Sequence, residues 1–153
     1  MYHSPVGDTV ILGPADGAMT LADSDRDLLC IAGGTGLAPI KAIVEQAISE
    51  AVAGRQRKIT LYVGARQNFD LYDLQDLQLL ESAYAGLRVI PVLSDQPGYS
   101  GLSGLLPDVV YEHESESLAD CEAYICGPAG MVSRTAALLA GHIPPGQLHH
   151  DPF

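Results

Sequence analysis

The sequence has no tryptophan, only three cysteines, and only eight lysine and arginine residues among its 153 residues. An odd number of cysteines without paired spacing argues against a disulfide framework, and no further ligands complete a zinc site around Cys121 and Cys126. Three cysteines also cannot hold a four-cysteine iron–sulfur cluster. The few basic residues are scattered, which argues against nucleic-acid binding because phosphate contacts need a basic face.

Long apolar runs are absent as well. No run approaches the ~18 residues that a membrane span requires, and the Met-Tyr-His-Ser-Pro start lacks the basic and apolar regions of a signal peptide. We therefore expect no membrane association and a cytoplasmic location. Hydrophobic residues make up 47% of the chain, enough for the core of one domain, and the net charge of −11 predicts a self-repelling surface.

Short apolar runs alternate with helical periodicity from Leu28 onward. The runs are typical of buried parallel strands and fall at residues 28–32, 59–63, 87–93 and 123–126, with a fifth short strand expected at 147–150. Apolar residues recur at helical spacing in 40–52, 71–84, 105–111 and 131–139. The pattern predicts an α/β fold, an open five-stranded parallel sheet with helices on both faces, as in Rossmann-like nucleotide-binding domains.

Other segments carry weaker signals. Residues 1–27 are rich in glycine, proline and aspartate and predict one strand, around residues 10–12, followed by a linker. Asp70 precedes an apolar periodic segment and is predicted to cap a helix there; it could also contact an adenosine ribose, but the capping role explains it fully. The acidic stretch 112–120 is predicted to be a surface loop.

The segment Gly33-Gly34-Thr35-Gly36 lies between the first predicted strand and its helix. Ligands of parallel α/β sheets bind beyond the carboxyl ends of the strands. Glycines there let backbone N–H groups approach a phosphate, the helix N-terminus adds partial positive charge, and the Thr35 hydroxyl can donate to the same oxygens. The loop departs from the dehydrogenase fingerprint, since Pro39 stands where a third glycine is expected.

The second predicted strand ends in Gly64-Ala65-Arg66 instead of the acidic residue that binds a ribose 2′-hydroxyl in NAD-dependent dehydrogenases. Three roles are open for Arg66: contact with a 2′-phosphate, contact with the pyrophosphate, or a solvated loop position. The fourth predicted strand ends in Cys126-Gly127-Pro128, which brings this cysteine to the same edge of the sheet. Because no His, Lys or Arg stands beside it in sequence, Cys126 is not marked as an activated thiolate; positioning of a ligand and simple burial are both open.

Taken together, these motifs resemble the NAD(P)-binding half of the ferredoxin–NADP reductase superfamily. The matching pieces, in that family's order, are Ala32-Gly33-Gly34-Thr35-Gly36-Leu37-Ala38-Pro39, Gly64-Ala65-Arg66 with Asp70-Leu71-Tyr72, Cys126-Gly127-Pro128 with Met131, and the terminal aromatic Phe153. The resemblance implies that the glycine loop binds pyrophosphate and that the turn after strand two reads the adenosine end. It also implies that Cys126 presents nicotinamide, and that Phe153 covers a flavin ring or is merely a frayed end.

The resemblance also extends to residues 1–27, which look like the end of a flavin-binding barrel and its linker, leaving residues 28–153 as the NAD(P)-binding domain. The Arg-x-Tyr-Ser/Thr signature that holds flavin in that family is absent. The resemblance implies that this chain is a module of an NAD(P)H-dependent flavin reductase and that FAD is bound by another domain. The isolated chain would then be inactive, and in the whole reductase the electrons would pass to haem or an iron–sulfur cluster. The sequences of several segments most resemble reductases that are fused to a globin domain. The reductases of multicomponent oxygenases are a close second.

Two alternatives stay open at this point: a non-enzymatic nucleotide-binding or docking module, and the electron-transfer subunit of a synthase. The coenzyme is also open. The missing acidic residue favours NADPH, whereas the resemblance favours NADH, to which we give a slight preference.

Overall fold

The structure is a computed structural model that describes residues 5–11, 13–14, 17 and 19–152. Its strands are β1 (Asp27–Gly33), β2 (Ile59–Ala65), β3 (Leu87–Leu93), β4 (Leu102–Ser103), β5 (Cys121–Gly127) and β6 (Leu148–Pro152). Its helices are α1 (Leu37–Val52), α2 (Leu74–Ala83), α3 (Leu106–Glu114) and α4 (Ala129–Leu139), with 3-10 turns at Gly34–Gly36, Asn68–Asp70 and Leu118–Asp120.

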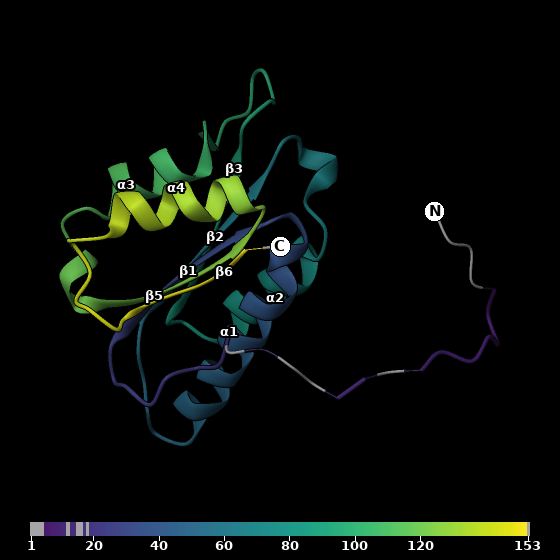
Figure 1. The fold of residues 1–153 in the computed structure, drawn as a ribbon, viewed down its shortest axis with the longest axis horizontal. Helices are drawn as coiled ribbons and strands as arrows, with labels where there is room; N and C mark the ends of the chain where they lie inside the picture. Colours follow the sequence, from purple (N-terminus) through teal and green to yellow (C-terminus); the bar gives the residue numbers. More distant parts are fainter. Residues whose placement is uncertain (1–4, 12, 15–16, 18, 153) are drawn as a thin grey trace.

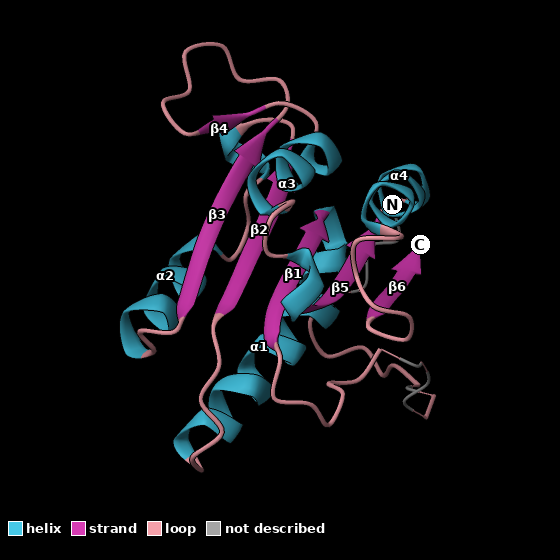
Figure 2. Ribbon diagram, turned by 90° about the vertical axis from the view of Figure 1, so that its left-hand side faces the viewer, coloured by secondary structure: helices cyan, strands magenta, loops and turns pink. Residues whose placement is uncertain are grey.

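All six strands pair in parallel, in the order β4-β3-β2-β1-β5-β6, so the strand order reverses direction at β1 (Figure 2). The predicted α/β fold is confirmed, but the predicted count of five strands is wrong. The sixth strand is β4, which pairs with Val92 and Leu93 at the edge of the sheet. It has only two residues, between Gly101 and Gly104, and is too short to produce an apolar pattern.

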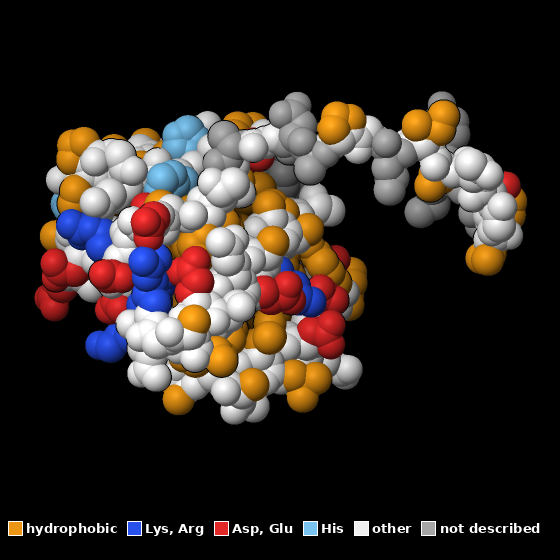
Figure 3. All heavy atoms as spheres, turned by 90° about the horizontal axis from the view of Figure 1, so that it is seen from below, with side chains coloured by type: hydrophobic (Ala, Val, Ile, Leu, Met, Phe, Trp, Pro, Cys, Tyr) orange, Lys and Arg blue, Asp and Glu red, His pale blue; other side chains and the backbone are white. Residues whose placement is uncertain are grey.

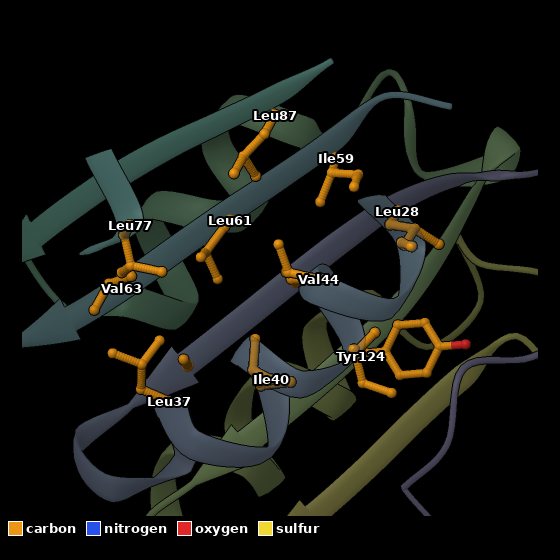
Figure 4. Packing of buried hydrophobic residues seen from close by; sticks show 14 of the residues in the cluster. Leu28, Leu37, Ile40, Val44, Ile59, Leu61, Val63, Leu77, Leu87 and Tyr124 are labelled. Atoms are coloured by element: carbon orange, nitrogen blue, oxygen red, sulfur yellow. The ribbon is translucent and has the colours of Figure 1, made fainter. Parts of the chain in front are cut away.

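Helices cover both faces of the sheet: α1 and α2 lie on one side, and α3 and α4 lie on the other (Figure 1). The continuous apolar strands explain this arrangement, because successive side chains point to opposite faces. In β1, Leu28 and Cys30 pack under α1, while Leu29 and Ile31 pack under α3 and α4. Figure 4 shows the first of these cores, where Ile40 of α1 lies among side chains of the sheet.

The part of the chain before β1 has two distinct portions. Val10 and Ile11 lie in no strand and are exposed in the segment that leads away from the body of the molecule (Figure 3); Leu12 lies outside the described residues. The expected strand is therefore not found at the described positions. Nearer to β1, the backbone N–H of Ala22 donates to the Tyr124 hydroxyl at 2.8 Å, and the Ser24 hydroxyl donates to Glu122.

Two local expectations are wrong. Asp70 does not cap α2: it is the last residue of a 3-10 turn, where its carboxylate accepts from the backbone N–H of Gln67 at 3.1 Å. The helix begins later because Asp73 takes a left-handed conformation with φ of 58° and pairs with Lys41 of α1 at 2.9 Å. The acidic stretch 112–120 is only partly a loop, since α3 continues through Glu114 and a 3-10 turn occupies the last three positions.

Candidate functional site

A groove of about 560 Å³ lies at the carboxyl ends of β1, β2 and β3, on the face that α3 and α4 cover. It is lined by Gly33, Gly34, Gly64, Ala65, Arg66, Asp70, Val92, Ser94, Gly104, Leu105, Leu106, Pro107, Pro128, Gly130, Met131 and Arg134. Both helices point their N-termini into this edge of the sheet, because each one follows a strand that ends there. The groove therefore lies where parallel α/β sheets bind ligands.

The glycine loop divides between the groove and the core. Gly33 and Gly34 line the groove. A Cβ on Gly33 would lie 2.5 Å from the Met131 sulfur, whereas Gly34 has open space around it and a φ of 53° that favours glycine. Thr35 is exposed and does not line the groove, and its contact with phosphate stays a prediction.

Gly36, by contrast, faces the protein. A Cβ at this position would lie 2.3 Å from the carbonyl oxygen of Cys126, so the absence of a side chain lets the start of α1 approach the end of β5. Pro39 is the third residue of α1 and also does not line the groove. The N-terminal turn of a helix tolerates proline because the N–H groups there have no intrahelical partner. The packing at Gly36 and the helix start at Pro39 thus explain why these residue types stand there.

The turn after β2 forms one end of the groove. A Cβ on Gly64 would lie 2.7 Å from a methyl group of Leu106, so the glycine brings β2 and α3 together. Ala65 and the exposed side chain of Arg66 continue the lining. Farther along the chain, the Tyr72 hydroxyl donates to the Gly34 carbonyl oxygen at 3.1 Å, which connects this turn to the glycine loop.

Cys126 is 3% exposed and packs in the core cluster beneath α1, on the face of the sheet opposite the groove. Burial raises the pKa of its thiol, which disfavours the thiolate, in agreement with the absence of activating neighbours in the sequence. Gly127 does not line the groove but borders it: a Cβ there would lie 2.9 Å from the Gly33 carbonyl oxygen. Pro128 and Met131 do line it, and their binding role stays a prediction.

Phe153 lies outside the described residues, so its predicted contact with flavin stays a prediction. The strand before it, β6, pairs with β5 such that Pro152 lies beside Gly127. The last described residues therefore run along the sheet to the edge where the groove opens.

The motifs in the sequence did not predict the contributions of the turn after β3 and of the first turn of α3. These are Val92, Ser94, Gly104, Leu105, Leu106 and Pro107. Gly130 and Arg134 of α4 were also missed, although they follow the Cys-Gly-Pro turn at helical spacing. The available signal was topological, because every carboxyl end of a parallel strand reaches the same edge.

Two absences characterise the described residues. None of their helices is both long and apolar enough to cross a membrane. Among them, no three His, Cys, Asp or Glu side chains gather closely enough to hold a metal ion. The three cysteines are all unpaired and buried.

A parallel sheet with a glycine-lined groove at its carboxyl edge defines a nucleotide-binding α/β domain, and comparison with known proteins specifies which one. Residues 30–137 match the family described as the oxidoreductase NAD-binding domain. The chain belongs to this family, within the ferredoxin–NADP reductase superfamily, as its motifs predicted. The family's reductases use FAD together with NAD(P)H.

Individual relatives agree with this assignment. The chain is 39% identical over 129 residues to the electron transfer component of a xylene/toluene monooxygenase from Pseudomonas putida, covering 82% of this chain and 36% of the relative. It is 36% identical over 151 residues to a ferredoxin–NAD(P)+ reductase component of naphthalene dioxygenase and salicylate hydroxylase systems from a Ralstonia species, covering 97% and 45%. A crystal structure of an Amycolatopsis cytochrome P450 reductase aligns with a TM-score of 0.77 at 30% identity, covering 98% and 42%. The chain thus spans less than half the length of these three relatives.

Proposed function

We propose that this chain presents NADH or NADPH to an FAD held by another domain, and that the reductase then passes electrons singly to an iron–sulfur or haem acceptor. The observation that carries the proposal is the glycine-lined groove across the ends of β1, β2 and β3. Its volume lies in the range of small-molecule sites, and side chains at Gly33 or Gly64 would clash with Met131 or Leu106 in the closely packed walls of the groove. The iron–sulfur and haem acceptors are suggested by the names of the relatives.

The hydride chemistry belongs to the nicotinamide and the flavin, and the chain supplies binding and orientation. Gly34 and the first turn of α4 offer the backbone and the helix N-terminus that favour the charge of a pyrophosphate. The Cys126 thiol lies on the opposite face of the sheet, so the Cys126-Gly127-Pro128 turn supports the nicotinamide end through its backbone and through Pro128, which lines the groove. No residue of the site needs to act as an acid or a base.

The same proposal assigns residues 1–27 to the end of the flavin domain and its linker, and residues 28–153 to the NAD(P)-binding domain. It places FAD on a domain of the same polypeptide, with Phe153 against the flavin. We further propose a cytoplasmic location, for which the unpaired, buried cysteines are the supporting observation.

The test is nucleotide binding by a variant that blocks the groove without straining the fold. Gly130 lines the groove in the first turn of α4, and a Cβ there meets nothing within 4 Å. Gly130→Glu should place a carboxylate in the path of the pyrophosphate, and an acidic residue is favourable at a helix N-terminus. Ser133→Glu, exposed on the same helix but outside the groove lining, is the matched control.

Titration followed by nicotinamide fluorescence should show that the Kd for NADH rises at least about tenfold in Gly130→Glu. The control should bind NADH as the unchanged chain does, and neither variant should lower the unfolding midpoint. Failure of NADH and NADPH to bind at millimolar concentration would contradict the proposal. The isolated chain should also reduce ferricyanide negligibly until it is joined to a flavin domain; binding without turnover in that fusion would indicate the non-enzymatic alternative.

A further inference from the structure

Two arginines line the groove, and each has a carboxylate beside it. The Nη2 and Nε atoms of Arg134 lie 2.6 and 3.2 Å from the same oxygen of Asp108. The Nη2 atom of Arg66 lies 3.4 Å from a carboxylate oxygen of Asp95. Among the described residues, these two arginines are the only basic side chains in the lining, so the positive charge of the groove is already matched.

The position of Asp95 is fixed by the backbone. Its N–H donates to the carbonyl oxygen of Arg66 at 2.8 Å, and the N–H of Ser94 donates to the carbonyl oxygen of Ala65 at 3.0 Å. The turn after β3 is thus connected to the turn after β2 by consecutive hydrogen bonds. Because these bonds do not involve side chains, they hold the backbone of Asp95 beside that of Arg66 and keep the carboxylate within reach of the guanidinium group.

Asp70 adds a further carboxylate at the same end. It lines the groove, and one of its oxygens accepts the Gln67 N–H. A carboxylate can accept about four hydrogen bonds, so Asp70 retains capacity for ribose hydroxyls. Two guanidinium groups therefore stand against three carboxylates around the groove, which leaves an excess of negative charge.

We propose that this arrangement makes the site select NADH over NADPH, with Asp95 as the specificity-determining residue. The inference rests on the proposed function. The two coenzymes differ by a 2′-phosphate, which carries about two negative charges near neutral pH. Such a group would be repelled by Asp70 and would have to compete with Asp95 for Arg66, whereas a 2′-hydroxyl can donate to Asp70. The carboxylates that select the coenzyme thus lie in the turns after β2 and β3, whereas NAD-dependent dehydrogenases carry theirs at the end of the second strand itself.

The experiment compares the Kd values of NADH and NADPH for the unchanged chain, for Asp95→Asn and for Glu112→Gln. Glu112 is exposed on α3 outside the groove lining, so its variant removes the same unit of charge at a distance. We expect the unchanged chain to bind NADH at least about tenfold more tightly than NADPH. Asp95→Asn should lower the Kd of NADPH several-fold and leave that of NADH within about twofold, because the exposed pair with Arg66 is modest in strength.

Glu112→Gln should leave the ratio unchanged, and high salt should reduce the preference because it screens exposed charges. Equal binding of both coenzymes, or a preference for NADPH, would overturn the inference while leaving the proposed function intact. The same conclusion follows if Asp95→Asn and Glu112→Gln shift both coenzymes by one common factor, since only net charge would then matter. Failure of both coenzymes to bind would instead refute the proposed function.

Discussion

Replacement of Gly36 by alanine should destabilise the domain far more than the same change elsewhere in the glycine loop. The added Cβ would lie 2.3 Å from the Cys126 carbonyl oxygen and 2.4 Å from its carbon, where ordinary contacts begin at 3.4 Å. Relief therefore requires a separation of about 1 Å between α1 and β5. Overpacking of this kind costs about 1–3 kcal/mol, and we expect about 3 kcal/mol because the obstructing atoms are backbone and cannot rotate away.

Two glycines that line the groove provide comparisons for this loss of unfolding free energy. Gly34→Ala meets no atom but must hold a left-handed conformation, which costs about 1–2 kcal/mol. Gly130→Ala lies in open space within α4, where alanine is favoured over glycine by up to about 1 kcal/mol. Urea unfolding followed by far-ultraviolet circular dichroism measures all three. A loss for Gly36→Ala that is no larger than that of Gly34→Ala would refute the assignment of Gly36 to helix–strand packing.

Two further predictions concern buried polar and titratable groups. Glu122 accepts from Ser24 and lies 2.8 Å from His149 Nε2, so Glu122→Ala should cost about 2–3 kcal/mol and speed hydrogen exchange in residues 22–26, with Glu122→Gln milder. Burial raises the pKa of Cys30 from 9.0 to about 12, so the unfolded chain loses this proton first and stability should fall as pH rises from 9 towards 12. The fall amounts to about 1.4 kcal/mol per pH unit. The urea midpoints of Cys30→Ala should decline correspondingly less with pH. Parallel declines in the two proteins would contradict the attribution of the fall to Cys30.

The fold could be predicted from the sequence because the major strands are buried on both faces. Such strands appear as mostly apolar runs, and those of β1 and β2 lie between a charged residue and a glycine. The exceptions are elements whose stability comes from distant partners. The edge strand β4 pairs with β3, and Asp73, the left-handed residue directly before α2, pairs with Lys41 of α1. Neither partner is adjacent in the sequence.

The site was harder to predict because a glycine in a motif indicates only that a Cβ does not fit there. It does not indicate whether protein atoms or a ligand exclude the Cβ. At Gly33 and Gly36 the excluding atoms belong to the Met131 side chain and to the Cys126 backbone, which are about a hundred residues away in sequence. The alternation of side chains along β5 carried a usable signal. Cys126 has the same parity as Tyr124, which packs under α1, so strand geometry already places its thiol on the face opposite Gly127.

The groove and the segment that precedes β1 lie at opposite ends of the strands. Under the proposed function, this separation bears on how a preceding flavin domain would be joined. The groove lies at the carboxyl edge, whereas residues 22–26 are fixed near the amino ends of the strands, where Arg57 donates to the Ser24 carbonyl at 2.9 Å and Arg26 donates to that of Ala119 at 2.8 Å. Residues 22–26 therefore move with the sheet. A flavin domain attached before them would have to turn about residues preceding Ala22 and not at the start of β1, so the distance from that pivot to the groove is set by the length of the strands.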